Sequence, residues 1–216
     1  MLLALFIGSI FYSLVGNWFE VSLVNDILAG VPVSANDLHE SELRQEQSWI
    51  ITLSIWLLTS IVFMVVVARL ARACEELGTQ DLKYTSYAVV SYFIPFLNLV
   101  RPYRAMQEVW TSTEPNKDSS SFGASFSQPS SLVKLWWGLW IISRIYGNHV
   151  LRAASSADTN EELQMALYKH ITSDVIDFGL AIVTLLMIKA VLDRVERKWV
   201  THFGATSVPA AKVRSL

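Results

Sequence analysis

Apolar stretches long enough to cross a membrane recur along this chain. Residues 48–68 contain no charged side chain, and Arg69 and Arg72 follow directly. A helix needs about 20 apolar residues to cross about 30 Å of hydrocarbon, so this stretch predicts a transmembrane helix. The same pattern predicts four spans, at about residues 2–23, 48–68, 131–151 and 171–192. We therefore expect an all-α integral membrane helix bundle, a single domain over residues 1–200 with a cytoplasmic tail at 201–216.

A further apolar segment, residues 84–100, is shorter and contains Pro95. Its flanks, Lys83 and Arg101, are both basic. We interpret it as a Pro-broken re-entrant or interfacial segment, with a fifth full span as the alternative. Pro95 would leave a carbonyl group one turn earlier without a donor, which protein, water or the Asn98 side chain would have to satisfy.

Residues 101–110 show a helical period. Pro102 suits the first turn of a helix. The residues that share one face behind it are Tyr103, Met106, Val109 and Trp110. Two interpretations stay open, an amphipathic helix in the membrane interface and a helix packed on the protein's own cytoplasmic side. The re-entrant or interfacial segment thus covers residues 84–110, and a flexible cytoplasmic linker rich in Ser, Thr, Pro, Asn and Gly follows at residues 112–130.

Charge is distributed unevenly between the connections. The chain has 17 basic and 19 acidic residues and a formal net charge of −2, so no basic surface argues for nucleic acid. Residues 25–47 and 152–170, which we expect to be loops, are acidic and poor in Lys and Arg. Most basic residues follow the second and fourth spans. Since cytoplasmic loops are enriched in Lys and Arg, we expect both termini in the cytoplasm.

The first apolar segment has one alternative interpretation. Residues 33–35, Val-Ser-Ala, are small residues of the kind that signal peptidase cuts. The segment lacks a positively charged start, and this cut site lies late. We therefore favour a retained first span over a cleaved signal peptide.

Three of the predicted spans carry ionisable or amide side chains. Such groups cost about 2.5 kcal/mol or more in hydrocarbon, so each needs a partner or water. They occur in pairs three or four residues apart, on one face of each helix. The pairs are Asn17 with Glu20, Arg144 with Asn148, and Asp174 with Asp177.

Arg144 and Asp177 fall at similar depth, roughly 10 Å below the outer boundary at a rise of about 1.5 Å per residue. An ion pair between them is therefore geometrically feasible. Two roles are open for this polar cluster: interhelical hydrogen bonds that hold the bundle together, and a polar vestibule that admits an ion or small solute. We favour the first.

The chain carries no recognisable catalytic motif. It contains no G-x-S-x-G, no H-E-x-x-H, no P-loop and no glycine-rich dinucleotide turn. Asp174 and Asp177 stand on one helix turn, whereas an aspartyl protease brings carboxylates from different elements together. Cys74 is the single cysteine, and no His or Cys stands at metal-ligand spacing. We expect no enzyme activity, no metal site and no cofactor.

An unusual combination of Pro and Asn in an apolar setting stands between residues 93 and 103. The residues are Phe93, Ile94, Pro95, Asn98, Leu99, Arg101, Pro102 and Tyr103. With the paired Trp136 and Trp137, this pattern resembles a bacterial multi-pass membrane family known as domain of unknown function 4328, over residues 50–150. The resemblance implies a membrane location in bacteria and brings no established activity.

These observations predict a non-enzymatic, multi-pass protein of the bacterial inner membrane. We expect it to act through contacts with the lipid bilayer, with a membrane-protein partner or with further copies of itself. The alternative is a transporter or channel for a small solute or ion that uses the polar cluster in the outer half of the bundle.

Overall fold

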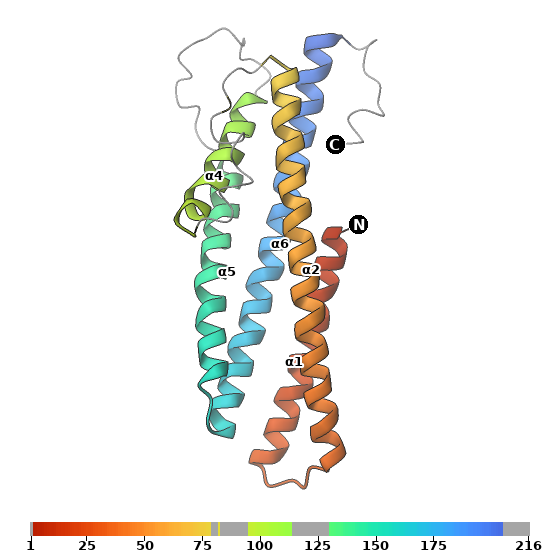
Figure 1. Cartoon of the computed structure of the whole chain (residues 1–216), viewed down its shortest axis with the longest axis vertical. Coiled ribbons are helices and arrows are strands. Elements are labelled where there is room, and N and C mark those ends of the chain that lie inside the picture. Colours follow the sequence, from red (N-terminus) through yellow and green to blue (C-terminus); the bar gives the residue numbers. More distant parts are fainter. Residues whose placement is uncertain (1, 79–81, 83–94, 114–129, 205–216) are drawn as a thin grey trace. The chain divides into compact units, whose positions relative to one another are not determined.

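The computed structural model describes residues 2–78, 82, 95–113 and 130–204. The described residues are helical and contain no strand, which confirms the all-α prediction. The helices are α1 (Leu2–Leu28), α2 (Ala35–Glu76), α4 (Pro95–Ser112), α5 (Ser131–Ser155) and α6 (Asn160–Phe203) (Figure 1).

Three of these helices, α1, α2 and α6, are long and apolar enough to cross a membrane. They contain the predicted spans at residues 2–23, 48–68 and 171–192. The helix α5 contains the remaining predicted span but is less apolar, because Arg144, Asn148 and His149 lower its hydropathy.

The acidic connections are largely helical, which corrects the loops expected at residues 25–47 and 152–170. Only residues 29–34 separate α1 from α2, and only residues 156–159 separate α5 from α6. Acidic side chains argue against a position in the hydrocarbon, but they do not prevent these residues from forming a helix. Charged helices are stable outside lipid when their ends are capped.

Local polar contacts set these helix ends. At the start of α2 the Ser34 hydroxyl accepts a hydrogen bond from the Asp37 amide at 3.1 Å, and the Ser34 amide donates to the Asp37 carboxylate at 3.3 Å, as in a capping box. The helix α1 ends at Leu28, and Gly30 lies two residues beyond it with a φ of 72°, which suits glycine. The Gly30 amide donates to the carbonyl of Ile27, and the Val31 amide to that of Asp26, which forms a Schellman motif.

The chain divides into two compact units. Unit 1 comprises residues 1–60 and 138–182, and unit 2 comprises residues 61–137 and 183–216. The helices α2, α5 and α6 contribute to both units.

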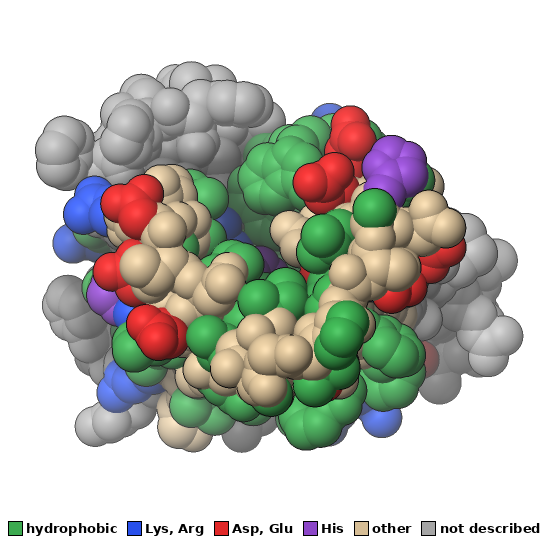
Figure 2. All heavy atoms as spheres, turned by 90° about the horizontal axis from the view of Figure 1, so that it is seen from below, with side chains coloured by type: hydrophobic (Ala, Val, Ile, Leu, Met, Phe, Trp, Pro, Cys, Tyr) green, Lys and Arg blue, Asp and Glu red, His purple; other side chains and the backbone are tan. Residues whose placement is uncertain are grey.

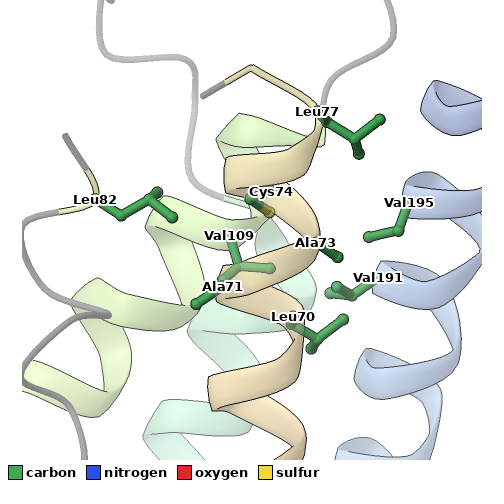
Figure 3. Packing of buried hydrophobic residues seen from close by; sticks show 9 residues of the cluster. All are labelled: Leu70, Ala71, Ala73, Cys74, Leu77, Leu82, Val109, Val191 and Val195. Atoms are coloured by element: carbon green, nitrogen blue, oxygen red, sulfur yellow. The ribbon is translucent and has the colours of Figure 1, made fainter. Parts of the chain in front are cut away.

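Unit 2 has an apolar core. Residues from α2, α4 and α6, together with residues 77 and 82, form this core: Leu70, Ala71, Ala73, Cys74, Leu77, Leu82, Val109, Val191 and Val195 (Figure 3). Those of α2 and α6 recur mainly at three- and four-residue steps, so they share one face of each helix. Cys74 is fully buried there, where it packs as a small apolar side chain.

The helix α4 packs on the protein through one face. Its buried residues are Pro102, Ala105, Met106 and Val109, at helical spacing. This burial favours the second interpretation above, a helix packed on the protein itself. Tyr103 and Trp110 lie at the edge of that face and are only partly buried.

The two prolines of α4 occupy different positions from those expected. Pro95 is the first residue of the helix, where an N–H group has no intrahelical partner, so it begins a helix instead of breaking one. Pro102, expected in the first turn, lies inside the helix. Residues 84–94 of the predicted re-entrant segment, and nearly all of the linker 112–130 and the tail 201–216, lie outside the described residues.

Cations from α6 cap the C-terminal end of α4. Arg194 donates to the Trp110 carbonyl at 3.2 Å and to the Thr113 hydroxyl at 3.3 Å, and Lys198 donates to the Ser112 carbonyl at 2.6 Å. The Arg194 guanidinium also lies 4.3 Å from the centre of the Trp110 ring. Cations near the last carbonyls of a helix interact favourably with its dipole, so these contacts fix α4 against α6.

Candidate functional site

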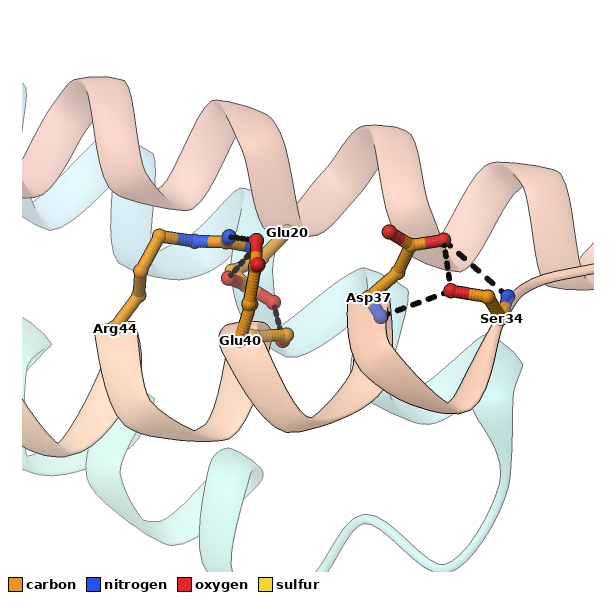
Figure 4. Close-up of polar contacts among 6 residues, drawn as sticks. Glu20, Ser34, Asp37, Glu40 and Arg44 are labelled. Carbon is orange, nitrogen blue, oxygen red and sulfur yellow. Dashed lines mark hydrogen bonds and ion pairs between the residues drawn. The ribbon is translucent and has the colours of Figure 1, made fainter.

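Glu20 connects α1 to the first turns of α2. Its side chain is buried and accepts hydrogen bonds from the Ser41 hydroxyl, from Arg44 Nη2 at 3.2 Å and from Gln45 Nε2 at 3.1 Å. Figure 4 shows Arg44 reaching across from α2 to Glu20. A buried carboxylate is costly unless it has such donors, and a cation supplies the strongest of them.

Asp174 connects α6 to α1. Its Oδ2 atom accepts hydrogen bonds from the Ser13 hydroxyl at 2.9 Å and from Asn17 Nδ2 at 3.0 Å. The same oxygen lies 3.6 Å from Nδ1 of His170, which is 2.9 Å from Asn17 Nδ2. Asn17 and Asp174 are thus the members of the predicted cluster that contact each other directly across two helices.

Asp177 connects α6 to α5, but not through Arg144. It accepts a hydrogen bond from the Ser143 hydroxyl at 2.5 Å, and the ion pair with Arg144 that the sequence allows is not among the ion pairs of the described residues. The Arg144 guanidinium instead lies over the rings of Trp56 on α2, at 5.2 Å, and Trp140, at 5.9 Å. Adjacent residues of a helix point about 100° apart. When Ser143 faces α6, Arg144 therefore faces α2.

The remaining predicted members lie apart. Asn148 is exposed and donates to the backbone carbonyl of Arg144 at 2.8 Å. Glu20 belongs to the α1–α2 contact and not to the group around Asp174. The predicted cluster is therefore three separate helix contacts and one arginine held by aromatic rings.

These contacts link the helices of unit 1 in pairs. Glu20 joins α1 to α2, Asp174 joins α1 to α6, Asp177 joins α5 to α6, and Arg144 joins α5 to α2. Every carboxylate in these links accepts a hydrogen bond from a serine of another helix. The arrangement can hold a bundle together inside a membrane.

Sequence reasoning missed most of the donors: Ser13, Ser41, Arg44, Gln45, Ser143 and His170. Ser13 precedes Asn17 by four residues, and His170 precedes Asp174 by four, so each shares a helix face with a residue that was recognised. This spacing could have found both. No local signal distinguishes Ser41 and Ser143 from other serines, because their role depends on the neighbouring helix.

The family-like motif begins outside the described residues, with Phe93 and Ile94. Pro95, Asn98 and Leu99 form the first turns of α4, and Arg101, Pro102 and Tyr103 follow. The Tyr103 hydroxyl accepts a hydrogen bond from Gln107 Nε2 at 3.0 Å, and its ring lies 6.0 Å from that of Trp137. The motif thus places α4 against the start of α5.

Comparison with protein families gives one match, the family described as Domain of unknown function (DUF4328), over residues 29–192. The chain belongs to this family. The match confirms the resemblance and extends it beyond residues 50–150, back to residue 29 and forward into α6. Comparisons with curated proteins and with solved structures give no match.

The described residues contain no group of three or more His, Cys, Asp or Glu side chains that could hold a metal ion. The carboxylates of Glu20, Asp174 and Asp177 are instead paired across helices with hydroxyl, amide or guanidinium donors.

Replacing Ser143 with Ala removes the hydroxyl that donates to Asp177. We expect the free energy of unfolding to fall by about 1 to 3 kcal/mol, because the partly buried Asp177 carboxylate loses its hydrogen bond. The measurement is thermal unfolding in detergent, followed with a thiol-reactive dye that reaches the buried Cys74 only on unfolding. The control is Ser54→Ala, at an exposed serine of α2. Equal effects of the two substitutions would contradict the assignment.

Proposed function

We propose that this chain is a non-enzymatic, four-span protein of the bacterial inner membrane that acts through contacts with lipid or with a partner protein. The helices α1, α2 and α6 supply three spans, and α5 is the proposed fourth. Its charged residue Arg144 is compatible with a span because the rings of Trp56 and Trp140 lie against the guanidinium.

The observation that carries the proposal is the length of α2 and α6. They have 42 and 44 residues, about twice the roughly 20 that a crossing requires. In unit 2 their C-terminal parts pack with α4 around the apolar core. A folded unit carried by membrane spans offers a surface for a partner or for lipid headgroups.

Charge supports an orientation in which unit 2 faces the cytoplasm. Unit 1 contains eleven acidic and four basic residues, whereas unit 2 contains eight acidic and thirteen basic residues. Figure 2 looks onto the end where α1 meets α2 and shows acidic side chains at its rim. Cytoplasmic segments are enriched in Lys and Arg, and anionic lipids attract them. Four spans then place both termini in the cytoplasm.

Labelling with a membrane-impermeant maleimide tests this orientation. In a Cys74→Ala background, we expect Ala29→Cys and Ala157→Cys, in the two short connections, to react on intact cells. Glu196→Cys, at an exposed position of unit 2, should react only after the membrane is permeabilised. Reaction of Glu196→Cys on intact cells would contradict the four-span orientation.

Mass measurement in mild detergent tests the contact role. We expect the native protein to retain a partner chain, a second copy or bound anionic lipid. The double variant Arg72→Gln, Arg197→Gln should lose the retained molecule, because both cations are exposed on unit 2. The matched control is Arg152→Gln with Lys169→Gln, in unit 1. A native protein that emerges alone and free of lipid in native mass spectrometry would refute the contact role.

Passage of an ion or small solute is the second candidate function. It is favoured by Arg144, whose Nε atom is buried without a hydrogen-bond partner. Charged groups within spans often mark pathways, because a water-lined surface lowers their cost.

Arg144→Ala separates the two functions. If Arg144 joins α5 to α2, as we propose, the substitution lowers the melting temperature in detergent and changes no flux in reconstituted vesicles. Ile145→Ala, at the exposed neighbouring residue, is the control. Loss of flux with an unchanged melting temperature would instead support passage.

A further inference from the structure

A cavity of about 270 Å³ lies between α1 and α2, beside the connection that joins them. Phe19, Leu23 and Asp26 line it from one face of α1, and Glu40 and Arg44 line it from one face of α2. Ser22, Asp37 and residues 31–33 of the connection line it as well. The lining therefore combines apolar side chains with polar groups and with charges of both signs.

The charged residues of the cavity have binding capacity left. Among the residues that the structure describes, the exposed Asp26 carboxylate has no hydrogen-bond or ion partner, and Glu40 has only a long contact of 4.0 Å with Arg44. Arg44 donates to Glu20 through Nη2, but its Nε has no partner. Because a guanidinium has five N–H donors, Arg44 can bind a second anionic oxygen while it stays paired with Glu20.

An exposed apolar stripe on α1 leads to this cavity. Phe11, Val15 and Phe19 follow at four-residue steps and are 66%, 40% and 58% exposed. Residues at this spacing share one helix face, and Phe19 itself lines the cavity. In a bilayer such a stripe contacts acyl chains, so a lipid lying on it would bring its headgroup to the cavity.

We propose that this cavity binds the headgroup of a phospholipid that carries a primary ammonium group. The ammonium group is placed between Asp26 and Glu40, and the phosphate accepts hydrogen bonds from Arg44. The acyl chains follow Phe11, Val15 and Phe19. The volume lies below the roughly 300 to 1,000 Å³ of sites for drug-sized ligands, which suits a headgroup better than a larger solute.

Native mass spectrometry of the full chain, released from nanodiscs, tests this proposal. The nanodiscs contain equal amounts of phosphatidylethanolamine, phosphatidylcholine and phosphatidylglycerol with the same acyl chains. We expect about tenfold preferential retention of phosphatidylethanolamine, because its ammonium can donate to both carboxylates. Phosphatidylcholine has no N–H donor, and phosphatidylglycerol has no cation.

Two variants test the residues. Asp26→Asn with Glu40→Gln should remove the preference, whereas Glu42→Gln with Glu46→Gln, which makes the same change of charge at exposed positions of α2 outside the cavity, should keep it. Arg44→Lys keeps a cation opposite Glu20 but loses the planar donor set. It should weaken retention of all three lipids at this site.

Equal retention of the three lipids by the native chain would overturn the proposal, and so would an unchanged preference in the Asp26→Asn, Glu40→Gln variant. Free phosphoethanolamine supplies the same charges without acyl chains. If it displaces the lipid at equal concentration, the ligand is the soluble compound and the lipid assignment is wrong. The labelling measurement does not depend on lipid retention, so the orientation can stand when this proposal fails. A partner chain or an anionic lipid retained without a preference for phosphatidylethanolamine would likewise overturn this proposal and leave the contact role in place.

Discussion

Unit 1 depends on hydrogen bonds between serine hydroxyls and carboxylates. An ionised carboxylate in an apolar medium costs several kcal/mol unless donors surround it. Glu20, Asp174 and Asp177 each obtain one donor from a serine on a different helix. Apolar contacts between helices in lipid have no hydrophobic driving force, because lipid tails are equally apolar. The directed hydrogen bonds can therefore fix how each helix is rotated, which apolar contacts alone do poorly.

Unit 2 is held by a different interaction. Its core is a continuous group of aliphatic side chains from α2, α4 and α6, and burial from water stabilises each Leu or Val by about 1.5 to 3 kcal/mol. That gain exists only where water is the alternative surrounding. Most of this core lies outside the predicted spans, at residues 70–82, 109 and 195, where water is that surrounding, whereas Val191 lies within the span at 171–192. Hydrogen bonds from Arg194 and Lys198 to the last carbonyls of α4 fix the orientation of that helix.

The sequence predicts those features that depend on local properties. The spans within α1, α2 and α6 follow from the length of apolar runs, and the family follows from a short motif around Pro95. The start of α2 at Ala35 differs from the loop that the acidic residues predict, although Ser34 and Asp37 form a local capping signal, because acidic side chains exclude lipid and not a helix. The partner of Asp177 could not be predicted. Depth along a helix follows from residue count, whereas rotation about its axis is set by packing against other helices.

The family match begins at residue 29, so α1 lies outside it while α2, α4 and α5 lie within it. The links between α5 and its neighbours, through Ser143 and Arg144, therefore lie wholly inside the matched range. The links of Glu20 and Asp174 each join α1 to a helix inside that range. Arg44 shows this dependence on α1 most clearly, because it pairs with Glu20 of α1 and also lines the cavity that α1 completes. Headgroup binding would then require α1 to be folded against α2. A substitution of Arg44 would affect both its contact with Glu20 and the binding of the headgroup.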